Sequence, residues 1–591
     1  MPFDGIAIKA VTEELNSSLL DARIDKIHQP EKDELLLTTR HPKFGTHRLL
    51  ISANARWSRM HMTEARKTNP KVPPSFCMLL RKYLEGGKIK SIRQVDFERI
   101  VHIDIEALDE FREWKSKILV CEFMGRHSNI ILINPENRII LDGIKRYGSD
   151  LSSFREVLPG KEYIDPPSQD KLNPLDIDYE ALVQKIWEQD SNIILSSALF
   201  QSCTGISPFL AKEICMSVGL DPNIPVEECG EYELTAIFRR LKALLIDVGK
   251  GQTQPTVIYN ENRPVEFCPY NPASGTYKTF DSFNIACDTF YTSKLDYLRL
   301  ESMKTNLSRN IKTILDKAYK KLFFQTGDLS NAEENEKYRI WGELITAYSY
   351  QFSKGDTLAV LNDFYTEEQV SIELDPRYTP MQNAQKYFKI YNKSRKAIKH
   401  LEGLMNRNRE EIDYLESILV AIQQAESPDE IDEIIEELEN ENYVKGQIKR
   451  RSRPNRSIPR RFISSDGMEI LVGRNNRQND ILSIKMAERT DLWLHTKNIP
   501  GTHVIIKLPR QIKSIQDMPD ATLEESALLA AHFSKAEQSE KVEVDYTFRS
   551  NVKKPGGARP GMVIYENYWT ILVNPQEERI KKLLEAEIKE T

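Results

Sequence analysis

Apolar residues recur every seven positions between Asn383 and Gln424, and this rhythm is the strongest pattern in the chain. One row holds Tyr391, Ile398, Met405, Ile412 and Leu419. A second row lies three residues later and holds Leu401, Leu415 and Ile422, with polar Ser394 and Asn408 at its other positions. These are the a and d positions of a coiled coil. A helix of about 40 residues is on the order of 60 Å long, at ~1.5 Å per residue.

A second helical run, Leu295 to Leu322, supplies a partner for this helix. Its apolar residues also repeat every seven, at Leu300, Leu307 and Ile314 and at Ile311 and Ala318. Gly327 to Asp375 interrupts the heptads with one short helical run and two strand-like runs. We therefore predict an antiparallel arm over 286–443 with an inserted middle lobe at 327–380. A dimerisation zipper between two chains is the alternative.

The N-terminal third predicts an α+β domain over 1–170. Helical spacing from Ile6 to Ile24 is followed by strand-like runs at 34–39, 47–52, 100–105, 117–123 and 129–134, with a helix at 73–85. The segment 171–249 is helical. Its Gly205 turn before Ser207 and Pro208 resembles a helix-hairpin-helix, although a plain packing turn fits as well. Alternation over 257–269 predicts return strands to the first domain within 250–285.

The C-terminal part predicts a second α+β domain over 462–575. Strands are expected at 469–472, 504–507, 541–546 and 568–573, with a helix at 522–534. A charged helix over 576–591 follows. Before this domain, Glu426 to Glu441 carries nine acidic residues and no basic one, and Lys445 to Arg461 carries eight basic residues and no acid. The linker 444–461 is thus either solvated charge or a contact for the phosphate backbone of RNA.

Composition limits the possible functions. The chain has 591 residues, 29% of them charged, with a net charge of −6, so several domains are expected and no global polycation exists. Seven scattered cysteines without a C-x-x-C pair predict reduced thiols rather than a zinc site or disulfides. The N-terminus lacks the regions of a signal peptide and no apolar run is long enough to span a membrane. We expect a cytoplasmic protein that does not contact membranes.

Motifs for common catalytic chemistry are missing. The sequence contains no G-x-x-x-x-G-K-[ST], no H-E-x-x-H and no G-x-S-x-G. Pro2 could act as an N-terminal amine nucleophile of the glycosylase type, but Phe3 follows it where such enzymes carry a carboxylate. His495 and His503 have no regularly spaced third ligand and are expected to form hydrogen bonds rather than bind a metal. We therefore expect no catalytic residue, cofactor or metal.

A polar loop after the strand at 469–472 is the best candidate for an RNA contact. Amides and arginines can recognise base edges and clamp phosphates. The expected RNA-contacting residues are Arg474, Asn475, Asn476, Asn479, Asp480, His495, Lys497, His503, Lys553 and Lys554. Glu98-Arg99 and Glu122 each lie beside a strand-like run, and spacing alone favours ordinary surface ion pairs there.

Several motifs together closely resemble the NFACT family along essentially the whole chain. They are Phe3-Asp4-Gly5, the runs at 76–82 and 124–129, the run at 383–388 and the loop at 472–480. The resemblance implies a glycosylase-like N-terminal domain, a helix-hairpin-helix module, a coiled-coil arm with a middle lobe, and an RNA-binding C-terminal domain named NFACT-R. These agree with the segments above.

The resemblance also implies a function. Bacterial members act in ribosome quality control: they bind the large ribosomal subunit and its rRNA while peptidyl-tRNA obstructs it. They recruit alanyl-tRNA, so that alanine is added to the stalled chain without mRNA and marks it for degradation. Such a member is not an enzyme, because the ribosome makes the peptide bond, and it is expected to be ribosome-associated and monomeric there. The family has also been described as fibronectin-binding, so a surface adhesin is the alternative.

In the family, two pairs of residues select tRNA, and this sequence differs from the family pattern at both pairs. An Asp-Arg pair falls on Glu98-Arg99, and an acidic residue followed by an isoleucine falls on Glu122-Phe123. We expect these four residues to bind tRNA, with the substitutions bearing on which tRNA is preferred.

Overall fold

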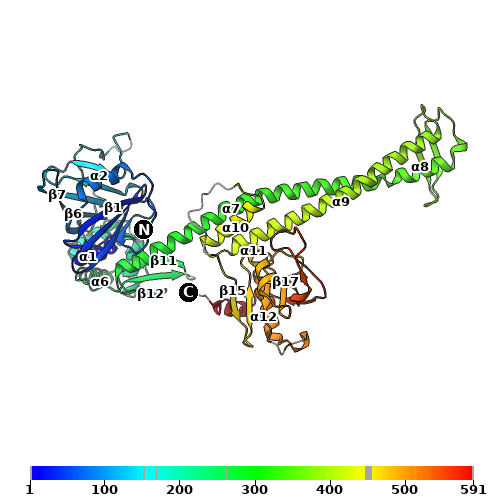
Figure 1. The fold of residues 1–591 in the computed structure, drawn as a ribbon. Coiled ribbons are helices and arrows are strands. Elements are labelled where there is room, and N and C mark those ends of the chain that lie inside the picture. The colour runs from blue at the N-terminus through cyan, green and yellow to red at the C-terminus, as the bar shows by residue number, and fades with distance from the viewer. Residues whose placement is uncertain are drawn as a thin grey trace. The chain divides into compact units, whose positions relative to one another are not determined.

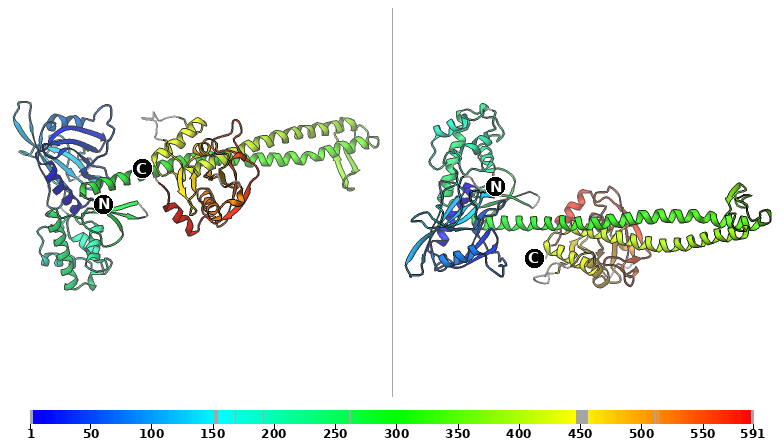
Figure 2. Two further views of the ribbon diagram at one scale, coloured as in Figure 1. Left: turned by 60° about the horizontal axis from the view of Figure 1, so that its bottom comes forward. Right: turned by 90° about the horizontal axis from the view of Figure 1, so that it is seen from above.

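A computed structural model describes residues 3–150, 154–167, 169–190, 192–260, 263–445, 456–509, 512 and 514–588. Its internal contacts divide the chain into two compact units, Met1–Leu295 and Asp296–Thr591 (Figures 1 and 2).

The N-terminal unit is built on one antiparallel sheet of nine strands, in the order β4-β3-β2-β1-β5-β6-β7-β8-β9. The strands are β1 Arg23–Glu31, β2 Glu34–His41, β3 Gly45–Ser52, β4 Arg59–Met62, β5 Lys88–Gln94, β6 Ile100–Leu108, β7 Trp114–Glu122, β8 Asn129–Ile133 and β9 Ile140–Gly143. Helices α1 Gly5–Leu19 and α2 Ser75–Leu84 share its buried apolar core. The mixed α+β class is confirmed.

The predicted helix Ile6 to Ile24 is too long. It ends at Leu19, Asp21 adopts a positive φ of 61°, and the chain enters β1 at Arg23. The apolar spacing of this stretch continues into the strand, and periodicity alone did not separate them.

Four helices follow the sheet: α3 Tyr179–Trp187, α4 Leu195–Ser202, α5 Pro208–Ser217 and α6 Glu231–Gly249. Ser207 caps α5 by accepting a hydrogen bond from the Leu210 amide at 3.1 Å. Gly205 has φ of 71°, and a Cβ there would lie 2.3 Å from the Phe97 carbonyl oxygen. The Gly205 turn is therefore packed against protein, which supports the packing alternative over a turn that faces phosphate.

The expected return strands form a sheet of their own. β10 Thr256–Asn260, β11 Arg263–Cys268 and β12 Thr276–Thr279 form a separate sheet in the order β11-β10-β12. Val257 and Phe267 nevertheless belong to the same apolar core as α1. The strands return to the core of the unit without pairing with its main sheet.

The two long helices form a hairpin within the chain. Helix α7 Phe283–Glu333 and helix α9 Pro380–Gln424 share one apolar seam (Figures 1 and 2). The Lys304 ammonium donates to the Gln423 carbonyl at 2.9 Å, whereas Asn335 donates to Ser394 near the far end at 2.9 Å. The helices thus run antiparallel, and the predicted coiled-coil arm is confirmed.

Polar seam positions fix the register of this pairing. The Asn408 amide nitrogen donates to the Ala318 carbonyl at 3.0 Å and to the Gln325 side-chain oxygen at 3.2 Å. A buried polar group in a seam favours the one alignment that satisfies it. Between the long helices, α8 Lys337–Ala347 and the hairpin of β13 Leu358–Asn362 with β14 Gln369–Glu373 form the middle lobe.

The C-terminal domain is a six-stranded antiparallel sheet in the order β15-β16-β18-β17-β19-β22. Its elements are β15 Arg460–Ile463, β16 Glu469–Val472, α11 Asn476–Asp480, β17 Leu492–Thr496, β18 Val504–Ile506, α12 Asp520–His532, β19 Val542–Phe548, β22 Trp569–Val573 and α13 Glu578–Glu585. β20 Val552–Lys553 pairs with β21 Ile564–Tyr565 apart from this sheet. β15 and β17 were not predicted. Across the described ranges, no helix is long and apolar enough to cross a membrane.

Candidate nucleic-acid interfaces

The turn between β5 and β6 presents Glu98 and Arg99 at half-buried positions. Asp96 and Phe97 before them adopt positive φ values of 42° and 58°. Such values are strained for residues with a side chain and persist only where the surroundings enforce them. Here Gln94 donates from its side-chain amide to the Glu98 carbonyl at 2.9 Å and to the Gly5 carbonyl at 3.0 Å. These bonds tie the Glu98 carbonyl to the start of α1, which positions the backbone of the Glu98-Arg99 pair.

Charge around this turn is mixed. Burial raises the pKa of Glu98, while neighbouring Arg99 opposes that rise. Burial and the positive charge of Arg99 lower the pKa of Lys171, whose ammonium donates to the Phe200 carbonyl at 2.9 Å. Arg99 and Lys171 thus lie close enough to repel each other. A phosphate between two such cations would relieve that repulsion.

Glu122 and Phe123 lie directly beneath this pair, in the core. Glu122 is 0% exposed, and its two oxygens accept from Arg155 at 2.7 and 2.6 Å. Tyr163 donates to the same carboxylate at 2.9 Å. The structure therefore does not support our expectation that Glu122 touches tRNA, because its carboxylate is buried and satisfied by its own chain.

Phe123 is also buried, at 1% exposure, and packs edge-on against Phe3 with ring centroids 5.2 Å apart. Its amide donates to the Arg99 carbonyl at 2.9 Å. The second pair therefore positions the first: the backbone of Phe123 holds the backbone of Arg99, and a direct contact of Phe123 with tRNA is not available in this geometry.

The loop after β16 does not face solvent as expected. Arg474 donates to Glu426 at 3.3 Å, to Glu430 at 3.1 Å and to Glu587 at 3.2 Å. Glu430 belongs to helix α10, Pro428–Asn440. The acidic run of the sequence is thus the counter-charge of Arg474, and this arginine is already neutralised.

The asparagine side chains of this loop also form hydrogen bonds within the chain. Asn475 donates to Glu433 at 2.9 Å, and Asn476 donates to Glu437 at 3.2 Å and to Ser417 at 2.8 Å. Asn479 accepts from the His503 amide at 3.2 Å. All three asparagines are under 5% exposed. A cavity of only about 10 Å³ remains against α9, which has no room for a nucleotide.

Two of the lysines predicted to contact RNA, Lys553 and Lys554, lie beside this loop, and one of them forms an ion pair. Lys554 forms an ion pair with Asp480, and both are partly exposed. Lys553 is exposed. Lys497 pairs with Glu543 at 3.2 Å at a partly exposed position.

The two histidines predicted to contact RNA, His495 and His503, make their contacts inside the domain. His503 is 2% exposed, and its Nδ1 lies 2.7 Å from the Ser483 hydroxyl, which accepts from the Trp493 indole at 3.1 Å. Burial lowers the pKa of His495 to about 4 and that of His503 well below its usual value, so both are neutral at pH 7. No group of three metal-ligating side chains occurs in the part of the chain that the structure describes.

A different basic surface is accessible on this domain. Lys485 and Arg489 are exposed, as is Lys553. Arg549 donates to the Ile484 carbonyl at 3.3 Å and the Ser550 amide to the Arg489 carbonyl at 3.2 Å, so the segments at 484–489 and 549–553 lie side by side. We call Lys485, Arg489 and Lys553 the Lys485 surface. Sequence reasoning named Lys553 but missed Lys485 and Arg489, because the three residues come from separate segments. Residues 446–455 of the basic linker lie outside the described residues.

Comparison with known proteins covers the whole chain. The family profile for NFACT N-terminal and middle domains matches residues 4–457, and that for the NFACT protein RNA binding domain matches residues 459–567. The chain is 35% identical to the Rqc2 homolog RqcH of Bacillus subtilis (strain 168) over 591 residues, covering 99% of this chain and 100% of that protein. It is 36% identical to the Rqc2 homolog RqcH of Streptococcus suis (strain 05ZYH33) over 584 residues, with 99% and 100% covered.

Solved structures also match parts of the chain. The N-terminal structure of the fibronectin/fibrinogen-binding protein from Streptococcus suis is 31% identical, with a TM-score of 0.41. The match covers 49% of this chain and 99% of that one.

Proposed function

This chain belongs to the NFACT family, and we propose that it binds large ribosomal subunits obstructed by peptidyl-tRNA and brings alanyl-tRNA to them. The coarser role, ribosome quality control with RNA binding, follows from homology to the RqcH proteins along their whole length. In the finer proposal, the stalled chain receives a C-terminal alanine tail without mRNA, and the tail marks it for degradation. The ribosome makes each peptide bond, so the protein acts as an elongation factor in the cytoplasm.

The Glu98-Arg99 turn is the observation that supports a tRNA role. Asp96 and Phe97 in this turn have positive φ values, and backbone strain of this kind concentrates at functional sites. Arg99 is half-buried, and the Phe123 amide donates to its carbonyl from the core. A preorganised arginine loses little freedom when it clamps a phosphate.

Sedimentation of a cell lysate tests the ribosome part of the proposal. We expect the protein in large-subunit fractions, increased after translation is stalled. An adhesin would instead be found outside ribosomal fractions. Absence from these fractions under stalling would overturn the proposal.

Sequencing of co-purified RNA tests the tRNA part. We expect alanine tRNA with the unmodified chain and its loss with Arg99→Ala, together with loss of alanine tails on stalled peptides. Arg40→Ala is the matched control, because Arg40 is an exposed arginine of the same sheet that pairs with Asp25 at 2.9 Å. Unchanged tRNA with Arg99→Ala would refute the role of this turn.

A further inference from the structure

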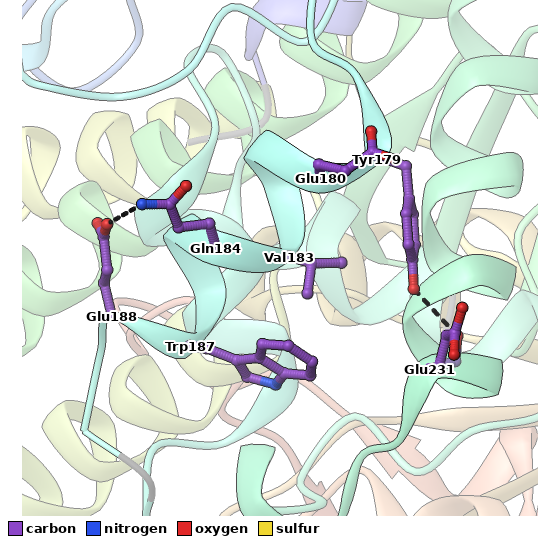
Figure 3. A pocket seen from close by; sticks show the side chains of 7 residues that line it. All are labelled: Tyr179, Glu180, Val183, Gln184, Trp187, Glu188 and Glu231. Atoms are coloured by element: carbon purple, nitrogen blue, oxygen red, sulfur yellow. Dashed lines mark hydrogen bonds between the residues drawn. The ribbon is translucent and has the colours of Figure 1, made fainter.

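A groove on the helical part of the N-terminal unit has no part in the RNA chemistry above. Helix α3 presents Tyr179, Val183 and Trp187 at intervals of four residues, hence on one face (Figure 3). These side chains line a cavity of about 540 Å³. The row spans about 12 Å at ~1.5 Å per residue, roughly two turns of a helix laid along it.

The aromatic side chain of Trp187, which lines the groove, is 58% exposed to solvent. Tyr232, which follows the lining residue Glu231 in sequence, is 83% exposed. Large aromatic residues that stand in solvent around a concave apolar surface are typical of protein docking sites, where Trp and Tyr contribute most of the affinity.

The rim of the groove is acidic. Glu180 and Glu188 border it from α3, and Glu231 borders it from the first turn of α6. The seven side chains that line it include no lysine, arginine or histidine. Lys185 on the same helix is paired with Asp170 at 2.9 Å and lies 4.0 Å from Glu188.

The favourable interaction of carboxylates with helix dipoles explains only part of the negative charge of this rim. Glu180 and Glu231 lie in first turns, where a carboxylate interacts favourably with the helix dipole. Glu188 is the C-cap of α3, where the dipole disfavours a negative charge. Within the chain, Gln184 donates to Glu188 at 3.0 Å and Lys185 lies 4.0 Å from it. All three carboxylates are nevertheless exposed to solvent, so the rim can attract a cationic partner.

We propose that this groove docks a cationic amphipathic helix of a partner protein. Apolar side chains one turn apart would lie along Val183 and Trp187, and flanking lysines or arginines would face Glu180, Glu188 and Glu231. Charge complementarity decides between protein and RNA: Trp187 could stack on a base, but three carboxylates repel the phosphates beside it. The groove thus serves a protein contact separate from tRNA binding.

Fluorescence anisotropy with the full-length chain tests the proposal. The probe is a labelled 18-residue peptide of leucine and lysine with leucines on one helical face. Comparison probes are the same composition in scrambled order, a version with glutamate in place of lysine, and a labelled oligoadenylate RNA. We expect saturable binding of the amphipathic cationic peptide, at least tenfold tighter than of the scrambled or acidic peptide.

Variants locate the binding. Trp187→Ala should weaken peptide binding at least tenfold, and so should the combined change Glu180→Gln, Glu188→Gln and Glu231→Gln. Trp114→Ala is the matched aromatic control, since Trp114 is 56% exposed. The exposed residues Glu31, Glu136 and Glu162 changed to Gln give a charge-matched control, and both controls should stay within twofold.

Three results would overturn the proposal. Equal binding of the scrambled peptide would show attraction by charge alone. Unchanged peptide binding in Trp187→Ala would place the contact elsewhere. A loss of oligoadenylate binding in Trp187→Ala would make the groove an RNA site.

Discussion

The turn at Glu98-Arg99 and the loop at 474–480 are both polar segments that follow a strand and carry an arginine. The charges that surround the two arginines differ. The loop meets the acidic helix α10, and Arg474 is 15% exposed among three carboxylates. The turn sits half-buried above the core, with Arg99 and Lys171 as like charges. Arg474 is therefore held by three carboxylates of its own chain, whereas Arg99 lies beside one carboxylate, Glu98, and a second cation, Lys171.

The largest effect is expected when the buried ion pair between Arg155 and Glu122, which lies below the turn, is removed. Arg155→Ala leaves the Glu122 carboxylate buried without its cation, and breaking such a pair costs about 3 to 5 kcal/mol. We expect a corresponding fall in the free energy of unfolding of the N-terminal unit, measured by urea denaturation, together with loss of tRNA. Arg23→Ala removes the ion pair of an exposed arginine with Asp25 and should cost under about 1 kcal/mol. Equal losses in both variants would contradict a supporting role for Glu122.

The next test separates stability from RNA binding in the loop. Arg474→Ala should lower the free energy of unfolding by about 2 to 3 kcal/mol, because Glu430 and Glu587 lose a partner in a poorly solvated place. Affinity for a labelled RNA hairpin should change less than twofold. Arg99→Ala should give the reverse ranking, with a smaller loss of stability than Arg474→Ala and with tRNA lost. An Arg474 variant that stays stable and loses RNA would break the comparison.

The arm was predictable from sequence because its information is local. Heptad spacing gave both long helices, and the polar seam residues Ser394 and Asn408 were visible as exceptions that later proved to bond across the hairpin. Periodicity is sufficient to predict that each helix packs its apolar row against another helix. It left open whether that partner belongs to the same chain or to a second copy.

The loop at 474–480 could not be predicted in the same way. Arg474 and Glu430 are 44 positions apart in sequence, and nothing in either segment alone shows that they meet. The buried Glu122 was likewise indistinguishable from a surface carboxylate, because its partner Arg155 comes 33 residues later in an irregular segment. Contacts between distant segments depend on the tertiary fold, which local patterns do not contain.

Titration offers a third way to examine the acidic helix. Burial raises the pKa of Glu437 to about 7, above its usual 4.5, so the folded state holds a proton that the unfolded state releases. The stability this proton contributes is complete below about pH 4.5 and is lost as pH rises through about 7. We expect the C-terminal unit to lose on the order of 2 kcal/mol between pH 5 and 8. Glu437→Gln should flatten that slope, and a slope unchanged in this variant would show that another group titrates.

The smallest effects are expected at the Lys485 surface, which is the counterpart of the Arg99 turn on the C-terminal domain. Lys485→Ala, Arg489→Ala and Lys553→Ala should each weaken binding of a labelled RNA hairpin about threefold, because each removes one phosphate contact without removing a buried partner. The slope of log affinity against log salt should fall by about one per residue. Lys581→Ala on α13 is the control, since Lys581 is exposed in the same domain. If the salt slope stays constant in all three variants, the phosphate contacts of this domain lie elsewhere, and the comparison would then rest on the Arg99 turn alone.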